Sequence, residues 1–350
     1  TYGVRYEFAS VPREVNGKIS NLREVLDSTL AVGDPYFANP STKNFAPRVG
    51  FAWSPGDKGQ WVVRGGYGIF FDLILPRSYF IVATRNPPFS NRVLVNSPRF
   101  PLTPGDVAAW RTIPPSVNSF APNPANPYLS QFNLTVDRLW RGWTISTGYV
   151  GSRGQNLTRQ AEANLAVSSV VNGVRTYNPA AGRVNPAFAG IVRVETDAQS
   201  FYNGLQVSAI RTLAKGVRAQ VSYTFSKSID DTSGIVSSDF INSTQYTLDY
   251  TDRRLDRGLS SFHAAHVFVA NGAWMIPAPA GARGWSRHLM RGWQLHNITT
   301  VQSGHPFSLL MGFNRSGNLN TASLTFHDRP DVNPEFRGNP ITGDPRRYWD

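Results

Sequence analysis

Long runs of alternating side chains constrain this chain more than any other feature of its sequence. From Trp61 to Asp72, every second residue is uncharged and mostly apolar or aromatic, whereas the intervening positions mix glycine with the charged Arg64 and Asp72. Successive side chains of a β-strand point to opposite sides of the sheet, so this period of two predicts a strand with one apolar and one mixed face. The apolar face either packs into a soluble core or contacts lipid in a membrane-spanning barrel.

The same alternation recurs along the chain and predicts further strands. These strands are expected at 45–54, 128–138, 143–153, 200–211 and 217–228, with two less regular ones near 262–276 and 293–303. Charged residues occur on the apolar faces only at strand ends, as Arg138, Arg153, Arg211 and Lys227. A lipid-facing arginine or lysine costs roughly 2–4 kcal/mol at mid-bilayer and little at the surface, so this placement favours strands that cross a membrane.

The lengths of the strands and of their connections point the same way. The expected strands run to about 10–12 residues, close to the 9–11 that a tilted membrane strand needs and longer than the 5–6 typical of soluble sheets. Short turns follow Ser54, Arg138 and Arg211, and long loops follow Asp72, Arg153 and Ser228. Short turns at one end and long loops at the other predict an all-β fold, an antiparallel up-and-down transmembrane β-barrel.

The tryptophans gather at one end of the expected strands. Seven of the nine flank short or medium turns. We interpret six of them as membrane-interface aromatics: Trp53, Trp61, Trp140, Trp143, Trp274 and Trp293. Indole rings prefer the boundary between lipid and water and form girdles around outer-membrane barrels, whereas a sandwich core would place tryptophan in mid-strand.

Composition excludes several classes of protein. The 350 residues include 25 prolines and 30 glycines but only 17% charged residues, which does not fit a helix-rich soluble domain. There is no cysteine, so a disulfide framework and cysteine metal sites are excluded. The net charge of +12 comes mostly from arginine. It suits anionic lipid phosphates, and because the arginines are scattered over turns and loops, nucleic-acid binding is not expected.

Neither catalytic nor metal-binding residues stand out. The nucleophile motif G-x-S-x-G of hydrolases does not occur. On a strand, His263 and His266 would face opposite sides, so no zinc site is expected. The aspartates of "DYTDRRLD", Asp249, Asp252 and Asp256, leave loop calcium open, although the neighbouring arginines favour salt bridges. The expectation is therefore no enzyme, no cofactor and no metal centre.

Polar residues on the mixed faces are the candidate site residues. They would face the lumen of a barrel, where they contact either a plug or a passing solute. The candidates are Arg64, Asp72, Gln131, Asn133, Arg218 and Gln220.

Seven segments resemble, in order, the barrel of Oar-like TonB-dependent receptors. They are "NFAPRVGFAW", "VVRGGYGIFFD", "NPYLSQFNLTVDR", "GYVGSRGQNL", "FYNGLQVSAIR", "VSYTFSKSIDD" and "GWQLHNITTVQSGHPFS", and the resemblance covers most of residues 1–330. Members of that family have a regulatory domain, a plug and a barrel of about 22 strands. They are outer-membrane receptors energised through the TonB complex.

The resemblance implies that residues 1–350 are a fragment of a TonB-dependent receptor barrel domain, with about nine strands of an incomplete barrel. The signal peptide, plug and closing strands are not recognised in it. The implied location is the outer membrane of a Gram-negative-type envelope. The implied partners are outer-membrane lipid, the protein's own plug, the TonB system and an unknown bulky solute such as a peptide, glycan or siderophore.

Two other functions remain open at the level of the sequence. A barrel of this kind could serve adhesion or secretion at the cell surface. A soluble secreted carbohydrate-binding β-protein would bury the apolar faces instead of exposing them. The exposure of those faces in the folded chain distinguishes this soluble alternative from the membrane interpretations.

Overall fold

The structure is a computed structural model of the chain. It describes residues 1–56, 59–74, 84–92, 100–110, 112–172, 174–213, 216–234, 247–277, 283–311, 313–317 and 328–331, together with shorter pieces between and after them. All statements below refer to these residues.

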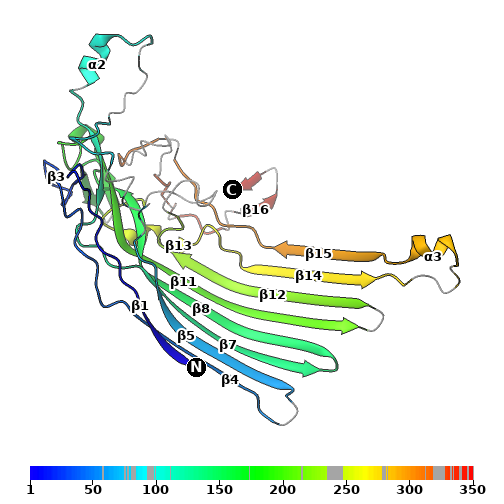
Figure 1. Ribbon diagram of the computed structural model, residues 1–350. Helices are drawn as coiled ribbons and strands as arrows, with labels where there is room; N and C mark the ends of the chain where they lie inside the picture. The colour runs from blue at the N-terminus through cyan, green and yellow to red at the C-terminus, as the bar shows by residue number, and fades with distance from the viewer. Residues whose placement is uncertain are drawn as a thin grey trace.

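One long, curved antiparallel sheet forms most of the molecule (Figure 1). Its nine main strands follow one another in space as they do in sequence: β1 (Tyr2–Tyr6), β4 (Phe45–Trp53), β5 (Trp61–Phe71), β7 (Tyr128–Trp140), β8 (Trp143–Glu162), β11 (Gly190–Leu213), β12 (Val217–Asp230), β14 (His266–Met275) and β15 (Gln294–Gln302). The expected antiparallel pairing of sequential neighbours is confirmed. Within the described residues, the first and last of these strands do not pair, so the sheet is an unclosed portion of a barrel.

Smaller elements occupy the connections. They are β2 (Ser20–Asn21), β3 (Ala31–Val32), α2 (Pro104–Trp110), β6 (Ser116–Phe120), β9 (Ser168–Val171), β10 (Val174–Tyr177), η1 (Pro179–Ala181), η2 (Arg253–Asp256), β13 (Gly258–Leu259), α3 (Trp285–Met290), β16 (Ile341–Asp344) and β17 (Arg347–Trp349). Among the helices described, none is both long and apolar enough to cross a membrane.

The turn between β7 and β8 shows how the short connections are made. Trp140 pairs directly with Trp143, leaving only two residues in the turn. These two, Arg141 and Gly142, have φ angles of 50° and 79°. Two consecutive positive φ angles match the right-handed twist of the flanking strands and give a tight hairpin. The register of this strand pair is thereby fixed at the tryptophan end.

Strands β8 and β11 are longer than predicted, with 20 and 24 residues. The segments expected at 143–153 and 200–211 continue beyond the sheet's other strands, and their extensions pair with each other from Val192–Glu162 to Thr196–Thr158. Two irregularities in register, between 196 and 200, bend this extension. The long loop expected directly after Arg153 therefore begins only after Glu162, and the extended strands support a folded layer.

The buried core lies in this loop layer and not in the main sheet. One cluster joins Ile19, Tyr36, Phe37, Phe120 and Val194. A second joins Leu22, Val117, Ala163, Phe188 and Ile191. Strand β6 pairs in parallel with the start of β11 and contributes to both clusters. The loops therefore pack as a small folded body at one end of the strands.

Register brings the alternating, mostly apolar positions of neighbouring strands onto one face. One row across the sheet reads Val63, Val136, Thr147, Val207, Tyr223 and Phe268. On this face Val63, Tyr67, Ile69, Leu134, Val136, Val221 and Tyr223, all at alternating positions of the expected strands, are exposed or half-buried, and Leu134 is 50% exposed. A two-sheet soluble core would bury them, so the soluble alternative is wrong for the described residues.

The exposure of this face generates a test in lipid. Leu205 and Gln206 are adjacent on β11, both exposed, and lie on opposite faces. Leu205→Arg in the full-length protein should lower the free energy of unfolding from lipid vesicles by about 2–4 kcal/mol, because it places a charge in hydrocarbon. Gln206→Arg should change it by less than about 1 kcal/mol. Equal losses in urea titrations would contradict the assignment of the lipid face.

Candidate functional site

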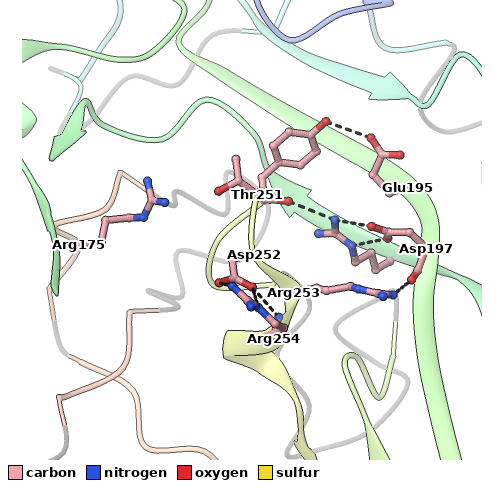
Figure 2. A pocket seen from close by; sticks show the side chains of 9 residues that line it. Arg175, Glu195, Asp197, Thr251, Asp252, Arg253 and Arg254 are labelled. Carbon is pink, nitrogen blue, oxygen red and sulfur yellow. Dashed lines mark hydrogen bonds and ion pairs between the residues drawn. The ribbon is translucent and has the colours of Figure 1, made fainter. Parts of the chain in front are cut away.

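A cavity of about 740 Å³ lies at the long-loop end of the molecule (Figure 2). The extensions of β8 and β11 form one side, and β10, η2 and the residues just before η2 form the other. Its lining residues are Arg159, Arg175, Glu195, Asp197, Tyr250, Thr251, Asp252, Arg253 and Arg254. Four of the nine carry guanidinium groups, which makes the positions of their counter-charges the deciding feature of the site.

Arg159 is the buried member of this set. Its guanidinium donates to both carboxylate oxygens of Asp197, at 2.6 Å and 3.0 Å, in the bidentate geometry that suits arginine. It also donates to the backbone oxygen of Tyr250 at 3.2 Å and to the hydroxyl of Thr247 at 3.1 Å. Because only 3% of Arg159 is exposed, it serves to fix β8, β11 and the segment before η2 together.

Asp252 and Arg254 form an exposed pair on the opposite side. Asp252 caps η2 by accepting from the backbone N–H of Arg254 at 3.1 Å. The Arg254 side chain donates to both Asp252 oxygens, at 2.8 Å and 2.9 Å. Hydrogen bonding from Arg254 lowers the pKa of Asp252 to about 2. This pair faces solvent, so an incoming polar group can exchange partners with it at low cost.

The remaining charges of the cavity are also paired. Arg175 contacts Asp249 at 3.1 Å, and Arg253 contacts Asp231 at 3.5 Å. Glu195 accepts from the Tyr250 hydroxyl at 3.2 Å, and Arg193, which is not among the lining residues, forms an ion pair with it at 2.8 Å. Each arginine thus has a carboxylate partner, and the cavity is polar but close to neutral.

The aspartates singled out from the sequence do form salt bridges. Their partners differ from those expected for two of the three: Asp249 pairs with Arg175, and Asp256 pairs with Arg329. Only Asp252 uses a sequence neighbour. The loops bring distant charges together, which no local spacing reveals. Within the described part of the chain, no group of three or more acidic, histidine or cysteine side chains could hold a metal ion.

The six candidate lumen residues share one face, opposite the apolar one. Gln131 pairs with Ser152 and Asn133 with Val150, while Arg218 and Gln220 lie three strands further along the sheet, on β12. Arg64 lies on this face next to Asp137 and forms an ion pair with it. Asp72 directly follows β5, whose alternation places it on the same side. The structure therefore does not bring all six together.

Gln131 and Asn133 line a second hollow of about 450 Å³, with Arg48 and Tyr202. The Arg48 guanidinium lies 4.3 Å from the centre of the Phe70 ring, and its buried Nε has no hydrogen-bond partner among the described residues. Arg48 was missed from the sequence because it sits among apolar residues of β4. Stacking on an aromatic ring is what allows a cation to remain there.

The loop cavity was also missed, although one signal was present. In "GIVRVETDAQS", charged residues alternate with uncharged β-branched ones from Val192 to Asp197, which continues the period of β11. Extending the strand by this pattern would have placed Arg193, Glu195 and Asp197 on one side. The partners from β10 and η2 carry no comparable signal.

Long antiparallel strands with an exposed apolar face, tight turns at one end and folded loops at the other define an outer-membrane β-barrel wall. The chain belongs to the outer membrane beta barrel domain family, whose model matches residues 1–349. It is accordingly a protein of the outer membrane. No curated protein matches the chain in sequence.

Solved structures with similar folds include three transporters or receptors. The outer membrane transporter YddB from Escherichia coli has 9% identity over 80% of this chain and 31% of that chain, with a TM-score of 0.47. The siderophore receptor PirA from Acinetobacter baumannii has 11% identity over 67% and 27%, with a TM-score of 0.37. The FrpB iron transporter from Neisseria meningitidis (F3-3 variant) has 11% over 67% and 25%, with a TM-score of 0.34. This chain thus spans no more than about a third of their length.

Glu162, the last residue of β8, is a buried carboxyl group in the loop layer, in contact with Ile191 of the second apolar cluster. Its Oε1 accepts from the amides of Ile191 and Asn164 at 2.7 Å and 2.9 Å, whereas its buried Oε2 has no hydrogen-bond partner in the described part of the chain. Burial raises the pKa of Glu162 to about 6, against the effect of those two amides. An oxygen without a donor is best accommodated when it carries a proton.

This pKa gives a pH-dependent prediction. Because the pKa of Glu162 is higher in the folded chain than in the unfolded one, its contribution to the free energy of unfolding is fully present below about pH 4.5. This contribution, roughly 2 kcal/mol, is lost as the pH rises through about 6. Glu162→Gln should remove that loss. In that variant, the protection factor of the Ile191 amide, which is its intrinsic exchange rate relative to the observed rate at each pH, should be constant over this range. Glu24→Gln, at an exposed position, should leave the wild-type profile of protection factor against pH. Identical profiles for wild type and Glu162→Gln would refute the prediction.

Proposed function

We propose that this chain forms barrel wall and loops of a TonB-dependent outer-membrane transporter, and that the loop cavity first holds a bulky polar solute. The observation that carries the proposal is the cavity of about 740 Å³, lined by paired arginines and carboxylates, at the folded long-loop end. Membership of the barrel family places the chain in the membrane where uptake begins. The proposal includes no catalytic step.

The pairing of charges favours a solute that both donates and accepts hydrogen bonds. A strongly anionic ligand would need arginines without carboxylate partners, and the lining arginines Arg159, Arg175, Arg253 and Arg254 all have one. A peptide or a glycan can replace one partner of an exposed pair and satisfy the other. Iron and siderophores, named for two of the similar structures, are therefore not the solutes proposed for this chain.

The polar face of the sheet would contact the plug and the solute after the solute has left the loop cavity. We propose that residues 1–350 are part of a larger receptor whose plug rests against this face, with Arg64, Asp72, Gln131, Asn133, Arg218 and Gln220 as contacts for plug or solute. A wide barrel needs such a plug to prevent leakage. The TonB system and the plug are accordingly the proposed protein partners, and Trp53, Trp61, Trp140, Trp143, Trp274 and Trp293 are the proposed interface aromatics.

Binding to the cavity can be tested directly. The full-length protein should bind a zwitterionic tetrapeptide or a neutral oligosaccharide more tightly than a ferric siderophore in calorimetric titrations. The double variant Asp252→Asn with Arg254→Gln should weaken that binding about tenfold, because two charge-assisted hydrogen-bonding groups are lost. Lys18→Gln, in another loop and outside the cavity lining, should leave it unchanged. Preference for the siderophore, or indifference to the double variant, would contradict the proposed solute site.

Conductance tests transport against a display or adhesion role. The full-length protein in planar bilayers should conduct little, and deletion of its plug should open a large pore. Arg64→Glu reverses a charge on the polar face and should raise leakage, whereas Arg141→Glu, in the β7–β8 turn, should not. The turn lysine Lys58, an alternative comparison, lies outside the described residues. Equal conductance with and without the plug would favour display.

A further inference from the structure

Basic side chains gather at one edge of the apolar face. We call Arg153, Lys227 and Arg257 the basic rim. Arg153 pairs across the sheet with Phe201, and Lys227 pairs with Asn203 one row away. Both belong to the apolar face by register. The row of Tyr149, Leu205 and Phe225 lies next to Lys227 on this face and one row further from Arg153. The rim therefore marks the boundary of the lipid-facing band at the long-loop end.

Arg153 is held in place by neutral groups. Its guanidinium donates to the backbone oxygens of Ser152 and Tyr202 at 2.8 Å and 2.9 Å, and to Oδ1 of Asn203 at 2.9 Å. It also lies 5.4 Å from the centre of the Phe201 ring. Ion pairs found within the described ranges include none for Arg153. Its orientation is fixed, but its charge has no carboxylate partner.

The other two members add to this positive charge. Arg257 stacks on the same Phe201 ring at 4.6 Å. Its carboxylate contact, Asp231, is 4.0 Å away and is shared with Arg253 at 3.5 Å. Lys227 is exposed and, among described residues, forms no ion pair. Among the described residues, the three cations of the rim thus have a single carboxylate contact, which Arg257 makes with Asp231 and shares with Arg253.

A ligand that suits this arrangement carries an anion above hydrocarbon. Tyr149, Leu205 and Phe225 below the rim are between 42% and 51% exposed and would contact acyl chains. Guanidinium and ammonium groups recognise phosphate oxygens through charge-assisted hydrogen bonds. We propose that the basic rim binds the phosphate of an outer-leaflet membrane lipid. This site is on the opposite face from the plug contacts and does not depend on the proposed transport function.

The opposite end of the strands supplies a matched control. There Arg138 stacks on Trp61 at 4.5 Å and Arg211 on Trp143 at 5.5 Å. Each of these arginines lies at the edge of the same apolar face, but each stacks on its own indole and the two do not share one ring. They have the same charge as the rim residues without its clustering.

Native mass spectrometry of the detergent-solubilised full-length protein tests the proposal. The probes are bisphosphorylated lipid A, its fully dephosphorylated form and inorganic phosphate. Arg153→Gln with Lys227→Gln should weaken binding of the bisphosphorylated lipid at least about tenfold, as expected when two charge-assisted contacts are lost. Arg138→Gln with Arg211→Gln should leave it within about twofold. Arg153→Lys with Lys227→Arg keeps the charge and should retain most of the binding.

Several results would overturn the proposal. Equal binding of the two lipids would show that phosphate is not recognised. Equal losses in the rim and control double variants would show only a general effect of charge. Loss in the charge-keeping variant as well as the glutamine variant would indicate damage to packing instead of loss of an anion site. Displacement of the lipid by millimolar inorganic phosphate would make the site one for free phosphate, contrary to the lipid proposal.

Discussion

The continuous ladder of backbone hydrogen bonds across nine strands is the interaction on which the rest of the structure depends. In hydrocarbon, an unpaired N–H or C=O group costs several kcal/mol, so a strand crosses only when both neighbours satisfy its backbone. That requirement keeps every strand paired, the tight turns set the register, and the register determines which side chains meet lipid. The exposed apolar face, the polar face with Arg64 and Asn133, and the basic rim are three consequences of one pairing scheme.

The loop layer is stabilised differently. Here two apolar clusters are buried, and the charged side chains of the layer form arginine–carboxylate ion pairs such as that of Arg159 with Asp197. The Arg159 guanidinium is buried although Asp197 is 45% exposed, so this pair holds its elements strongly, because removing Asp197 would leave the guanidinium desolvated. The Arg254 guanidinium is 85% exposed, and its pair with Asp252 has no such penalty. Within one cavity, the pair with the buried guanidinium thus gives rigidity and the pair with the exposed guanidinium gives exchangeable contacts.

Alternation predicted the membrane part of the fold well, because in a two-faced sheet the local sequence carries the deciding information. The strand expected at 61–72 is observed as Trp61–Phe71, and the candidate lumen residues share a face as the parity requires. The cavity could not be predicted in the same way. Arg175 meets Asp249, and Arg329 meets Asp256, only after long loops have folded. Their pairing depends on tertiary packing, which leaves no period in the sequence.

The length of β8 and β11 has a mechanical consequence for the cavity. Arg159, Glu195 and Asp197 stand on strands that continue, through two irregularities in register, into the membrane wall. These strands cannot slide against each other, since a shift of one residue would move every side chain to the wrong face. The side of the cavity formed by β8 and β11 is therefore anchored to the barrel. Any rearrangement around the proposed solute is left to the opposite side, where Arg175 stands on a short hairpin and Arg254 on a single helical turn.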